Sequence, residues 1–312
     1  TRDYKKDLIG YVMDRDQVKD IKAIEHLAEI AGLTLPRSSD YDPEAYRKQA
    51  ERASLLEACQ SYFTFCLEEA KGAETTRAYL EERGYSKELY LAMDLGYIPS
   101  QEKLYKYLKG KDYTEEQIDS LAFGNKTKIG ESHSLTIPCR SGGSIKGFKF
   151  RSIGQDTPKY LNSKGLDKGS LFNLSPLKGD KDLIIVEGEL DCLHATVKGI
   201  KNVVALAGNS LSSIMVQDAL KRGAKKFTIC LDREKGKEAE TAQKVNRAIE
   251  VILAEGVNRV YTVTLPALGD KTDPDSLLKE KGKEALQKAI DEASLYYTHK
   301  LTEVIKPYRV IQ

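Results

Sequence analysis

The chain of 312 residues lacks the sequence features of several large protein classes. Its five cysteines are odd in number and form no CxxC pair, which predicts a reduced, cytoplasmic protein without structural zinc. Cys192 and Cys230 lie in apolar patterns, which predict buried thiols. No run of about 18 apolar residues occurs, so no membrane-spanning helix is expected. No apolar signal-peptide core follows Thr1, and the missing initiator Met indicates a trimmed chain or an internal fragment.

Several motifs of nucleotide-binding and hydrolytic enzymes are also absent. The sequence contains no GxxxxGKS or GxxxxGKT, and no GxGxxG, HExxH or GxSxG. These absences exclude a P-loop ATPase, a dinucleotide enzyme, a zinc protease and an α/β hydrolase. Hydrophobic residues make up 40% and charged residues 31%, which is typical of a soluble globular protein that at this length has about two domains.

Positive charge is concentrated in one segment, although the net charge is only +2. Residues 135–181 hold nine Lys or Arg residues against three acids, and such a basic segment suits a polyanionic substrate. Single exposed lysines are usually only solvated. Lys149 and Arg151, however, alternate on one predicted strand and share a face, which makes them candidates for phosphate contacts.

Helical patterns fill the first part of the chain. Helices are expected in residues 7–36 (two), 43–72, 75–84, 87–93 and 114–121, with a polar linker at 37–42. One apolar face of the long helix is formed by Leu55, Leu56, Cys59, Phe63 and Cys66. The helix at 75–84 is expected to begin at a Thr cap and to end at Gly84.

The period of the pattern then changes. Residues 134–139 and 144–151 predict two strands joined by an SGG turn, and residues 159–174 predict an irregular basic loop. From Asp182, four strand segments (LIIVEG, VVALAG, KFTICLD and RVYTVTL) alternate with helical segments, which predicts a parallel sheet with right-handed crossovers. An acidic loop and further helices follow Pro266. The expected fold class is therefore α/β.

Acidic residues follow two of these strands. Glu187 comes directly after LIIV, and Asp232 and Glu234 come after FTICL. Because ligand sites of open α/β sheets lie at the carboxyl ends of the strands, these three carboxylates are expected to converge on one point. Carboxylates without Cys or His nearby form a hard-oxygen site suited to Mg²⁺ or Mn²⁺.

Structural interpretations of the acids remain open. The first turn of a helix favours acids, which would account for Asp191, and a solvated loop end would account for Asp232 and Glu234. Asp273 precedes a proline and could simply cap the next helix. A role for Asp273 and Asp275 in a second metal site is equally open.

Several segments, taken in order, resemble one protein family. EGELD, AGNS, LDRE and DPDSLL follow the order of the TOPRIM domain shared by primases and topoisomerases. Bacterial DnaG-type DNA primases have segments similar to PKYLNSKGLDKGSLFNL, SIKGFKFRSI, TTRAYLEERGYSKELYLAMDLGYIP, and DLIGYVM followed by AIEHLAEIAGLTLP. The resemblance covers nearly the whole chain. EGELD is also similar to phage helicase-primases, which fits a phage or mobile-element enzyme.

This resemblance implies a TOPRIM-type parallel sheet with helices on both faces, preceded by a mixed α+β subdomain and followed by C-terminal helices. The implied parts are the tail of a zinc-binding domain without its ribbon (1–40), an N-terminal primase subdomain with a basic groove (41–178), TOPRIM (179–268) and a C-terminal helical segment (269–312). The implied activity is DNA-dependent synthesis of short RNA primers on single-stranded DNA from ribonucleoside triphosphates, by two-metal nucleotidyl transfer. A replicative helicase is a further implied partner.

The resemblance also assigns roles by motif. Two or more Mg²⁺ or Mn²⁺ ions would be held by Glu187, Asp232 and Glu234, with Asp273 and Asp275 in support. The nucleotide and template groove would be lined by Lys149, Arg151, Lys159, Tyr160, Asn162 and Lys168, with Gly208 and Asn209 in the loop beside the metals. A TOPRIM nuclease and a catalytically weakened primase-like nucleic-acid-binding module are the alternatives.

Three features depart from the family pattern. DREKG stands where the family usually has DxDxxG, so Glu234 replaces an Asp and its longer arm changes the metal cage. The strand SHSLTIPC lacks the usual arginines and offers only His133 for template contacts. Zinc-ribbon ligands are absent ahead of Asp7, which fits either a cut chain or a different selection of start sites.

Overall fold

The computed structural model describes residues 8–31, 43–121, 123, 128–164, 166, 169–177, 179, 181–208 and 210–297. Contacts divide the chain into two compact units, Thr1–Glu51 and Arg52–Gln312. The linker expected at 37–42 lies outside the described residues, and the four-part division of the chain stays a prediction. Within the described ranges no helix combines the length and apolarity needed to cross a membrane.

The first unit contains the two helices that the sequence predicts near its start. These are α1 (Leu8–Asp16) and α2 (Asp20–Ala31), which contact each other. Val12, Ala23 and Ala28 are their buried apolar side chains. The long helix α3 (Pro43–Glu69) begins in this unit and continues into the second.

Helices of the second unit follow the sequence expectation with two corrections. Those that come before its long strands are η2 (Lys71–Ala73), α4 (Glu74–Glu82), α5 (Lys87–Ala92), α6 (Gln101–Lys109) and α7 (Glu115–Asp119). The expected Thr cap of α4 is wrong, because its N-cap is Ala73, which offers no side-chain acceptor. Helix α6 was not predicted, although Ser100 caps it by accepting a hydrogen bond from the Lys103 backbone N–H.

A four-stranded antiparallel sheet packs against α3 in this unit. Its strands, in the order β1-β2-β3-β4, are β1 (Gly96–Tyr97), β2 (Leu135–Ser141), β3 (Ser144–Arg151) and β4 (Tyr160–Asn162). The predicted hairpin is confirmed as β2 and β3, and its turn residues Gly142 and Gly143 both have positive φ, as a tight hairpin turn requires. Strand β4 corrects the expectation of an irregular loop, since it pairs with β3.

The second sheet is the predicted α/β sheet. Its order is β11-β9-β7-β5-β6, in which β5 (Asp182–Val186), β6 (Val203–Ala205), β7 (Lys226–Ile229) and β9 (Val260–Thr262) are parallel. Two features were not predicted: β11 (Ser294–Leu295) adds an antiparallel edge, and β8 (Arg233–Glu234) pairs with β10 (Lys271–Thr272).

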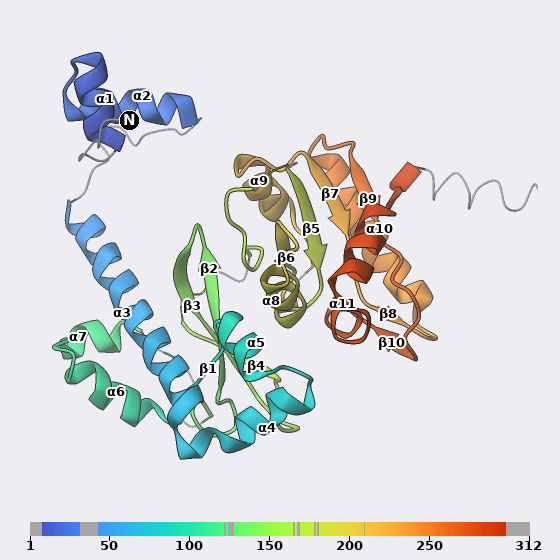
Figure 1. The fold of residues 1–312 in the computed structure, drawn as a ribbon, viewed down its shortest axis with the longest axis horizontal. Coiled ribbons are helices and arrows are strands. Elements are labelled where there is room, and N and C mark those ends of the chain that lie inside the picture. The colour runs from blue at the N-terminus through green and yellow to red at the C-terminus, as the bar shows by residue number, and fades with distance from the viewer. Residues whose placement is uncertain are drawn as a thin grey trace, which may run out of the picture. The chain divides into compact units, whose positions relative to one another are not determined.

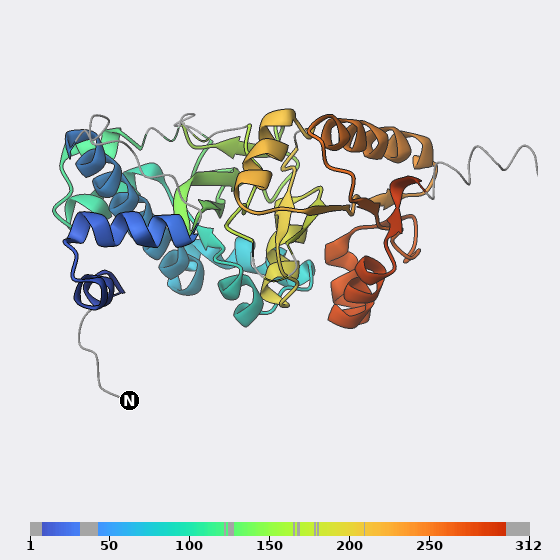
Figure 2. The same cartoon turned by 90° about the horizontal axis from the view of Figure 1, so that it is seen from above.

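Helices cover both faces of this sheet, as expected. They are α8 (Glu189–Val197), α9 (Ser213–Lys221), α10 (Glu238–Ala254) and α11 (Pro274–Asp291). Alternate residues of β5 enter different cores: Leu183 and Ile185 pack with α9 and α10, while Ile184 and Val186 pack with α8 and α11. Figure 1 labels these elements, and Figure 2 shows the brown-orange α10 and the red α11 on opposite sides of the sheet.

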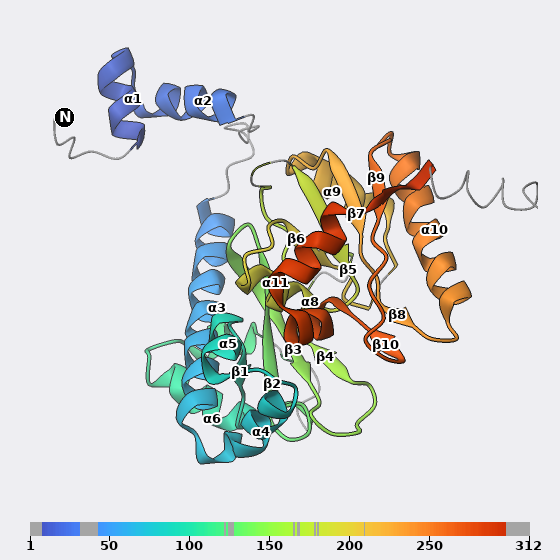
Figure 3. The same ribbon diagram turned by 45° about the vertical axis from the view of Figure 1, so that its right-hand side comes forward.

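One hydrophobic core joins the two sheets of the second unit. The cluster that contains Ile184 and Val186 also contains Leu135 and Ile137 of β2, and Tyr85 and Tyr90 beside α5. Helices α8 and α11, which are labelled in Figure 3, contribute Leu190 and Leu277 to this core. This shared core fixes the basic strand β3 relative to the acidic ends of β5 and β7.

A matched pair of phenylalanines on α3 tests the core of the antiparallel sheet. Phe63 is fully buried, and its ring packs edge to face on the ring of Phe148 with the two ring centroids 5.1 Å apart. Strand β1 packs closely on this residue, because a Cβ added to Gly96 would lie only 2.6 Å from the Phe63 Cβ. Phe65, two residues later, is 60% exposed. We expect Phe63→Ala to lower the free energy of unfolding by about 3–5 kcal/mol and Phe65→Ala to change it by less than about 0.5 kcal/mol.

Urea denaturation of both variants measures this difference. Equal losses of stability in the two variants would contradict the burial that the structure gives to Phe63.

Candidate active site

Four carboxylates gather at the carboxyl edge of the parallel sheet. Glu187 follows β5 and Asp232 lies in the loop after β7, so the parallel register brings their backbones to the same edge. Asp191 lies in the first turn of α8, and Asp273 is the N-cap of α11. The contributing segments come from distant parts of the sequence, and the sheet topology alone brings them together.

Electrostatic repulsion shows that these acids are close neighbours. Burial raises the pKa of Asp232, and the charges of Glu187 and Asp273 raise it further against the opposing effect of Lys271. The pKa of Asp191 is raised well above its usual value, first by burial and then by the charges of Asp273, Asp232 and Asp275. The edge of the sheet therefore concentrates negative charge that is partly removed from water.

Three of the predicted metal-binding carboxylates, those that follow β5 and β7, are each paired with a lysine. Glu187 Oε1 lies 3.0 Å from Lys244 Nζ, Asp232 Oδ2 lies 2.9 Å from Lys271 Nζ, and Glu234 Oε1 lies 2.7 Å from Lys237 Nζ. Among the residues that the structure describes, no three acidic, histidine or cysteine side chains are grouped closely enough to hold a metal ion. In this structure each of the three side chains is engaged by a different ammonium group, and their joint binding of a metal ion stays a prediction.

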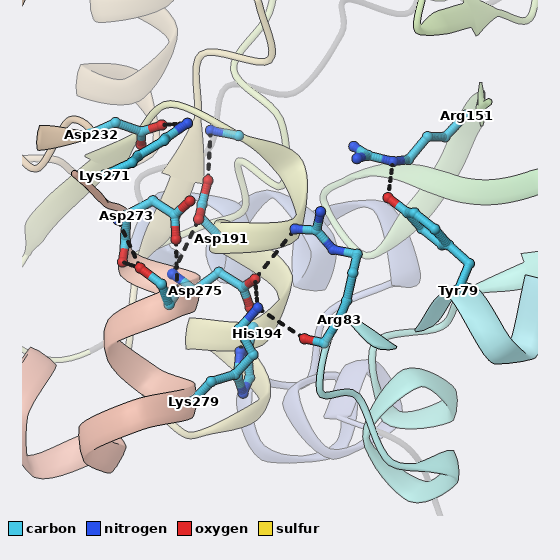
Figure 4. Close-up of polar contacts among 12 residues, drawn as sticks. Tyr79, Arg83, Arg151, Asp191, His194, Asp232, Lys271, Asp273, Asp275 and Lys279 are labelled. Carbon is cyan, nitrogen blue, oxygen red and sulfur yellow. Dashed lines mark hydrogen bonds and ion pairs between the residues drawn. The ribbon is translucent and has the colours of Figure 1, made fainter. Parts of the chain in front are cut away.

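Two of the four acids, Asp191 and Asp273, also bind the backbone of the cluster (Figure 4). Asp191 Oδ2 accepts a hydrogen bond from the Gly188 N–H at 3.2 Å, and Asp191 Oδ1 accepts one from the Asp275 N–H at 3.1 Å. Asp273 Oδ1 accepts from the Ser276 N–H at 2.7 Å, so it caps α11 as its position before Pro274 suggested. These bonds fix the starts of α8 and α11 side by side.

Asp275 lies in a buried network rather than at the open edge. Its carboxylate lies 2.8 Å from His194 Nδ1, 2.7 Å from Lys279 Nζ and 3.4 Å from the Arg83 guanidinium. Burial alone would raise the pKa of Asp275, but the hydrogen bonds from His194 and Lys279 outweigh it and lower the pKa. Through Arg83 this carboxylate ties α11 to the residue that ends α4.

Cations crowd on the facing side of the site. Arg151 Nε donates to the Tyr79 hydroxyl at 3.0 Å and Arg151 Nη1 donates to the Tyr160 hydroxyl, so two tyrosines hold the guanidinium in place. The pKa of Lys159 is lowered by the charge of Arg151, by burial, and by the charges of Arg83 and Lys271. Crowded positive charge of this kind favours the binding of an anion.

The other predicted groove residues lie along the same face of β3. Lys149 is buried, and its ammonium group donates to the carboxylate of Glu189 and, at 3.1 Å, to the carbonyl of Ala207. Asn162 is opposite Lys149 on β4, and both line a cavity of about 350 Å³ with Arg140, Lys146 and Arg222.

The loop after β6 is held beside the first acid. The Ala207 N–H donates to the backbone carbonyl of Glu187 at 3.0 Å, and Gly208 follows with a φ of 83°. Lys168 and Asn209, which were also expected in the groove, lie outside the described residues. The glycine has no side chain to block the approach of a ligand, and a Cβ added there would meet no atom within 4 Å.

Sequence reasoning missed several charged residues of the site. Lys244 and Lys271 belong to no recognisable sequence motif. The course of α10 brings Lys244 to Glu187, and the pairing of β10 with β8 brings Lys271 to Asp232. His133, the one candidate for template contact on its strand, is fully buried, and its ring nitrogens lie within hydrogen-bonding distance of Ser132 and the Pro158 carbonyl. It is therefore not exposed to a template.

The acids present fit a hard divalent cation. All the donors are carboxylate oxygens, which suit Mg²⁺ or Mn²⁺. Asp232 Oδ1 is buried and accepts no hydrogen bond from any described residue, so one ligand position is left unsatisfied. The lysines supply positive charge at the oxygens where a cation would bind.

Two family models match consecutive parts of the chain. The model described as DNA primase catalytic core, N-terminal domain, matches residues 62–174, and a Toprim-like model matches residues 184–278. The DNA primase of Pseudomonas aeruginosa is 28% identical over 304 residues, which cover 90% of this chain and 44% of that protein. The DNA primase of Escherichia coli K12 is 27% identical over 305 residues, which cover 91% of this chain and 51% of that protein.

Solved structures give the same family. The zinc-binding and RNA polymerase domains of the Aquifex aeolicus primase are 28% identical with a TM-score of 0.68, over 97% of this chain and 74% of that one. A DnaG primase catalytic domain bound to single-stranded DNA has a TM-score of 0.62 over 83% of this chain and 84% of that one; at 24% identity this likeness concerns the fold alone. The chain spans about half the length of the curated relatives it matches. It belongs to the bacterial DnaG-type primases, of which it carries the N-terminal domain of the catalytic core and the Toprim domain.

Proposed function

We propose that the chain is the catalytic core of a DNA primase, which joins ribonucleoside triphosphates into short RNA on a single-stranded DNA template. One observation carries this proposal: partly buried carboxylates at the ends of β5 and β7 lie beside a crowded set of cations. Lys271 connects the two groups, because it pairs with Asp232 and its charge also acts on Lys159. Phosphoryl transfer needs this combination, since it depends mainly on positioning and on neutralising phosphate charge.

In this proposal Mg²⁺ or Mn²⁺ ions are held by Glu187 and Asp232, with Asp191 and Asp273 beside them. Glu234 would join them after parting from Lys237. The bound ions would lower the pKa of the attacking 3′-hydroxyl and neutralise the leaving pyrophosphate. Asp275 acts as a positioning residue, because its carboxylate is engaged by His194 and Lys279 while its N–H orients Asp191.

The basic side of the site would hold the triphosphate and the template. Arg151 is oriented by Tyr79 and Tyr160, so its guanidinium is fixed before a phosphate arrives. Lys159 loses unfavourable repulsion when an anion binds near it, which favours a triphosphate there. Lys149 would position the loop that contains Gly208. Its ammonium group donates to the carbonyl of Ala207, and the Ala207 N–H donates to the carbonyl of Glu187, so the loop is held beside that acid.

Template contacts would extend from this point. Asn162, with the cavity that it lines, and Lys168 and Asn209 complete the proposed nucleotide and template groove. Binding to single-stranded DNA should weaken as salt rises, because the basic residues release counterions from the phosphates. A replicative helicase is the further partner proposed, and the cytoplasm is the proposed site of action.

Removal of single acids tests the chemistry. We expect the chain, incubated with single-stranded DNA, the four ribonucleoside triphosphates and Mn²⁺, to make short oligoribonucleotides that are resolved on a denaturing gel. Glu187→Gln and Asp232→Asn should lower the rate by about 100-fold or more, as loss of several kcal/mol of transition-state stabilisation requires. Glu250→Gln on the exposed side of α10 is the matched control and should keep the activity.

The outcomes separate the candidate functions. Shortened DNA in place of RNA product, lost in the same two variants, would identify a nuclease. Binding of single-stranded DNA without product would identify a binding module, and undiminished synthesis by Glu187→Gln would refute the assignment of the acids.

Repulsion among the acids also predicts an unusual effect on stability. The folded-state pKa of Asp232 lies above its ordinary value of 3.8, so between these two values the folded protein binds more protons than the unfolded chain. The free energy of unfolding therefore decreases as pH rises from the unfolded-state pKa of Asp232 to its folded-state pKa. In chelator, Asp232→Asn should be more stable than the wild type at pH 7, and the gain should shrink as pH falls toward 4.

Urea denaturation at several pH values gives this comparison, with Lys271, Glu187 and Asp273 as the charged groups that face Asp232. Adding Mn²⁺ at 100 times its Kd should stabilise the wild type by about 2.7 kcal/mol and the variant by less. A variant that is less stable than the wild type by the same amount at every pH would contradict the proposed repulsion.

A further inference from the structure

Lys271 occupies a central place in the acidic cluster. Its Nζ lies 2.9 Å from Asp232 Oδ2, and the charges of Asp273 and Asp191 act on the same ammonium group. In Figure 4 Lys271 and Asp232 are joined by an ion pair, with Asp191 and Asp273 next to them. One monovalent cation thus stands at oxygens where the proposed function requires a divalent ion.

The backbone of Lys271 is fixed between two acidic segments. Strand β10 pairs with β8 so that Lys271 lies opposite Glu234, two residues beyond Asp232. Asp273 follows two residues later as the cap of α11. A lysine at this position reaches the cluster in the folded chain without any motif in the sequence.

The side chain of Lys271, in contrast, is free to leave. It is 53% exposed, whereas the side chain of Asp232 is 17% exposed. A lysine carries its charge on a flexible four-carbon stem, and its ammonium group is strongly hydrated, so an exposed lysine regains water when it leaves a carboxylate. The ammonium group can therefore depart while the strand and the carboxylate stay in place.

The direction in which it would move is also set by its neighbours. Lys159 feels the charge of Lys271 together with those of Arg151 and Arg83, so the ammonium group already borders the cationic side of the site. A divalent ion at Asp232 would repel Lys271 from the acids, and a bound triphosphate would attract it.

We propose that Lys271 is a tethered cation that the metal displaces from Asp232 and that then binds the phosphates of the incoming nucleotide. This role rests on the proposed function of the acidic cluster as a metal site. It makes metal binding and triphosphate binding mutually supportive, because the ammonium group released by the first event serves the second.

Metal affinity measured without turnover tests the first step. Mn²⁺ binding is followed by electron paramagnetic resonance or calorimetry at fixed ionic strength, without nucleotide or template. Lys271→Met should bind Mn²⁺ about fivefold more tightly than the wild type, since the competing ion pair is gone. Lys235→Met is the matched control: Lys235 is close in sequence but pairs at 3.6 Å with the exposed Asp270, so its loss should leave Mn²⁺ affinity unchanged.

Nucleotide affinity tests the second step. In saturating Mn²⁺ and without template, Lys271→Met should bind ATP about fivefold more weakly than the wild type, while Lys235→Met should match it. A Lys271→Met protein with wild-type affinity for Mn²⁺, or with wild-type affinity for ATP in Mn²⁺, would overturn the proposal. Lys271→Gln repeats both measurements with a polar side chain, and the thermal melting of each variant confirms that it is folded.

A third variant separates this role from the metal site itself. If Asp232→Asn keeps the wild-type affinity for Mn²⁺, the metal site and with it the proposed function fail. If Asp232→Asn loses Mn²⁺ while Lys271→Met behaves as the wild type, the metal site stands and only the role of Lys271 is refuted.

Discussion

Mutual repulsion of carboxylates at one edge of the parallel sheet is the constraint on which this structure depends. Asp191 and Asp232 are held close together although burial and neighbouring charge both disfavour their ionised forms. The strand ends and the first turns of α8 and α11 determine where these acids lie. Lysines from α10 and β10 lie against Glu187 and Asp232 and offset part of this repulsion.

The same edge must stay in register with the basic strand β3. A shared hydrophobic core joins the two sheets, and two polar connections cross the same boundary. Lys149 of β3 is bound to Glu189 of α8, and Arg83 after α4 reaches Asp275 of α11. Both connections are buried at the acidic partner, where loss of one side leaves an uncompensated charge. Rigid coupling of this kind keeps acids and cations at a fixed separation, as positioning catalysis requires.

The altered acidic motif gains a structural explanation from the strand pair β8 and β10. Glu234 stands on β8, and its longer side chain turns toward Lys237 at the start of α10. The loop that carries β10 returns Lys271 to the acids, so Glu234 and Lys271 belong to one local arrangement. In the proposed metal site, these lysines would compete with the ion for the carboxylate oxygens.

Much of the fold followed from the sequence, because hydrophobic period, turn glycines and strand–helix alternation are local signals. These signals predicted the β2–β3 hairpin, the parallel sheet, and the position of Glu187 and Asp232 at strand ends, whereas helices on both faces of the sheet were implied by the family resemblance. The short strands β4, β8 and β10 were not predicted, since only pairing with distant residues stabilises them. Helix α6 was also missed, although the Ser100 cap and the spacing of Leu104 and Leu108 are local signals. Tertiary structure alone decided the direction in which each carboxylate points. It also decided that lysines from α10 and β10 pair with these carboxylates. An ion pair between residues tens of positions apart has no recurring pattern in the sequence. The strands of the sheet that brings those residues together do have such a pattern, because they are apolar runs that alternate with helical segments.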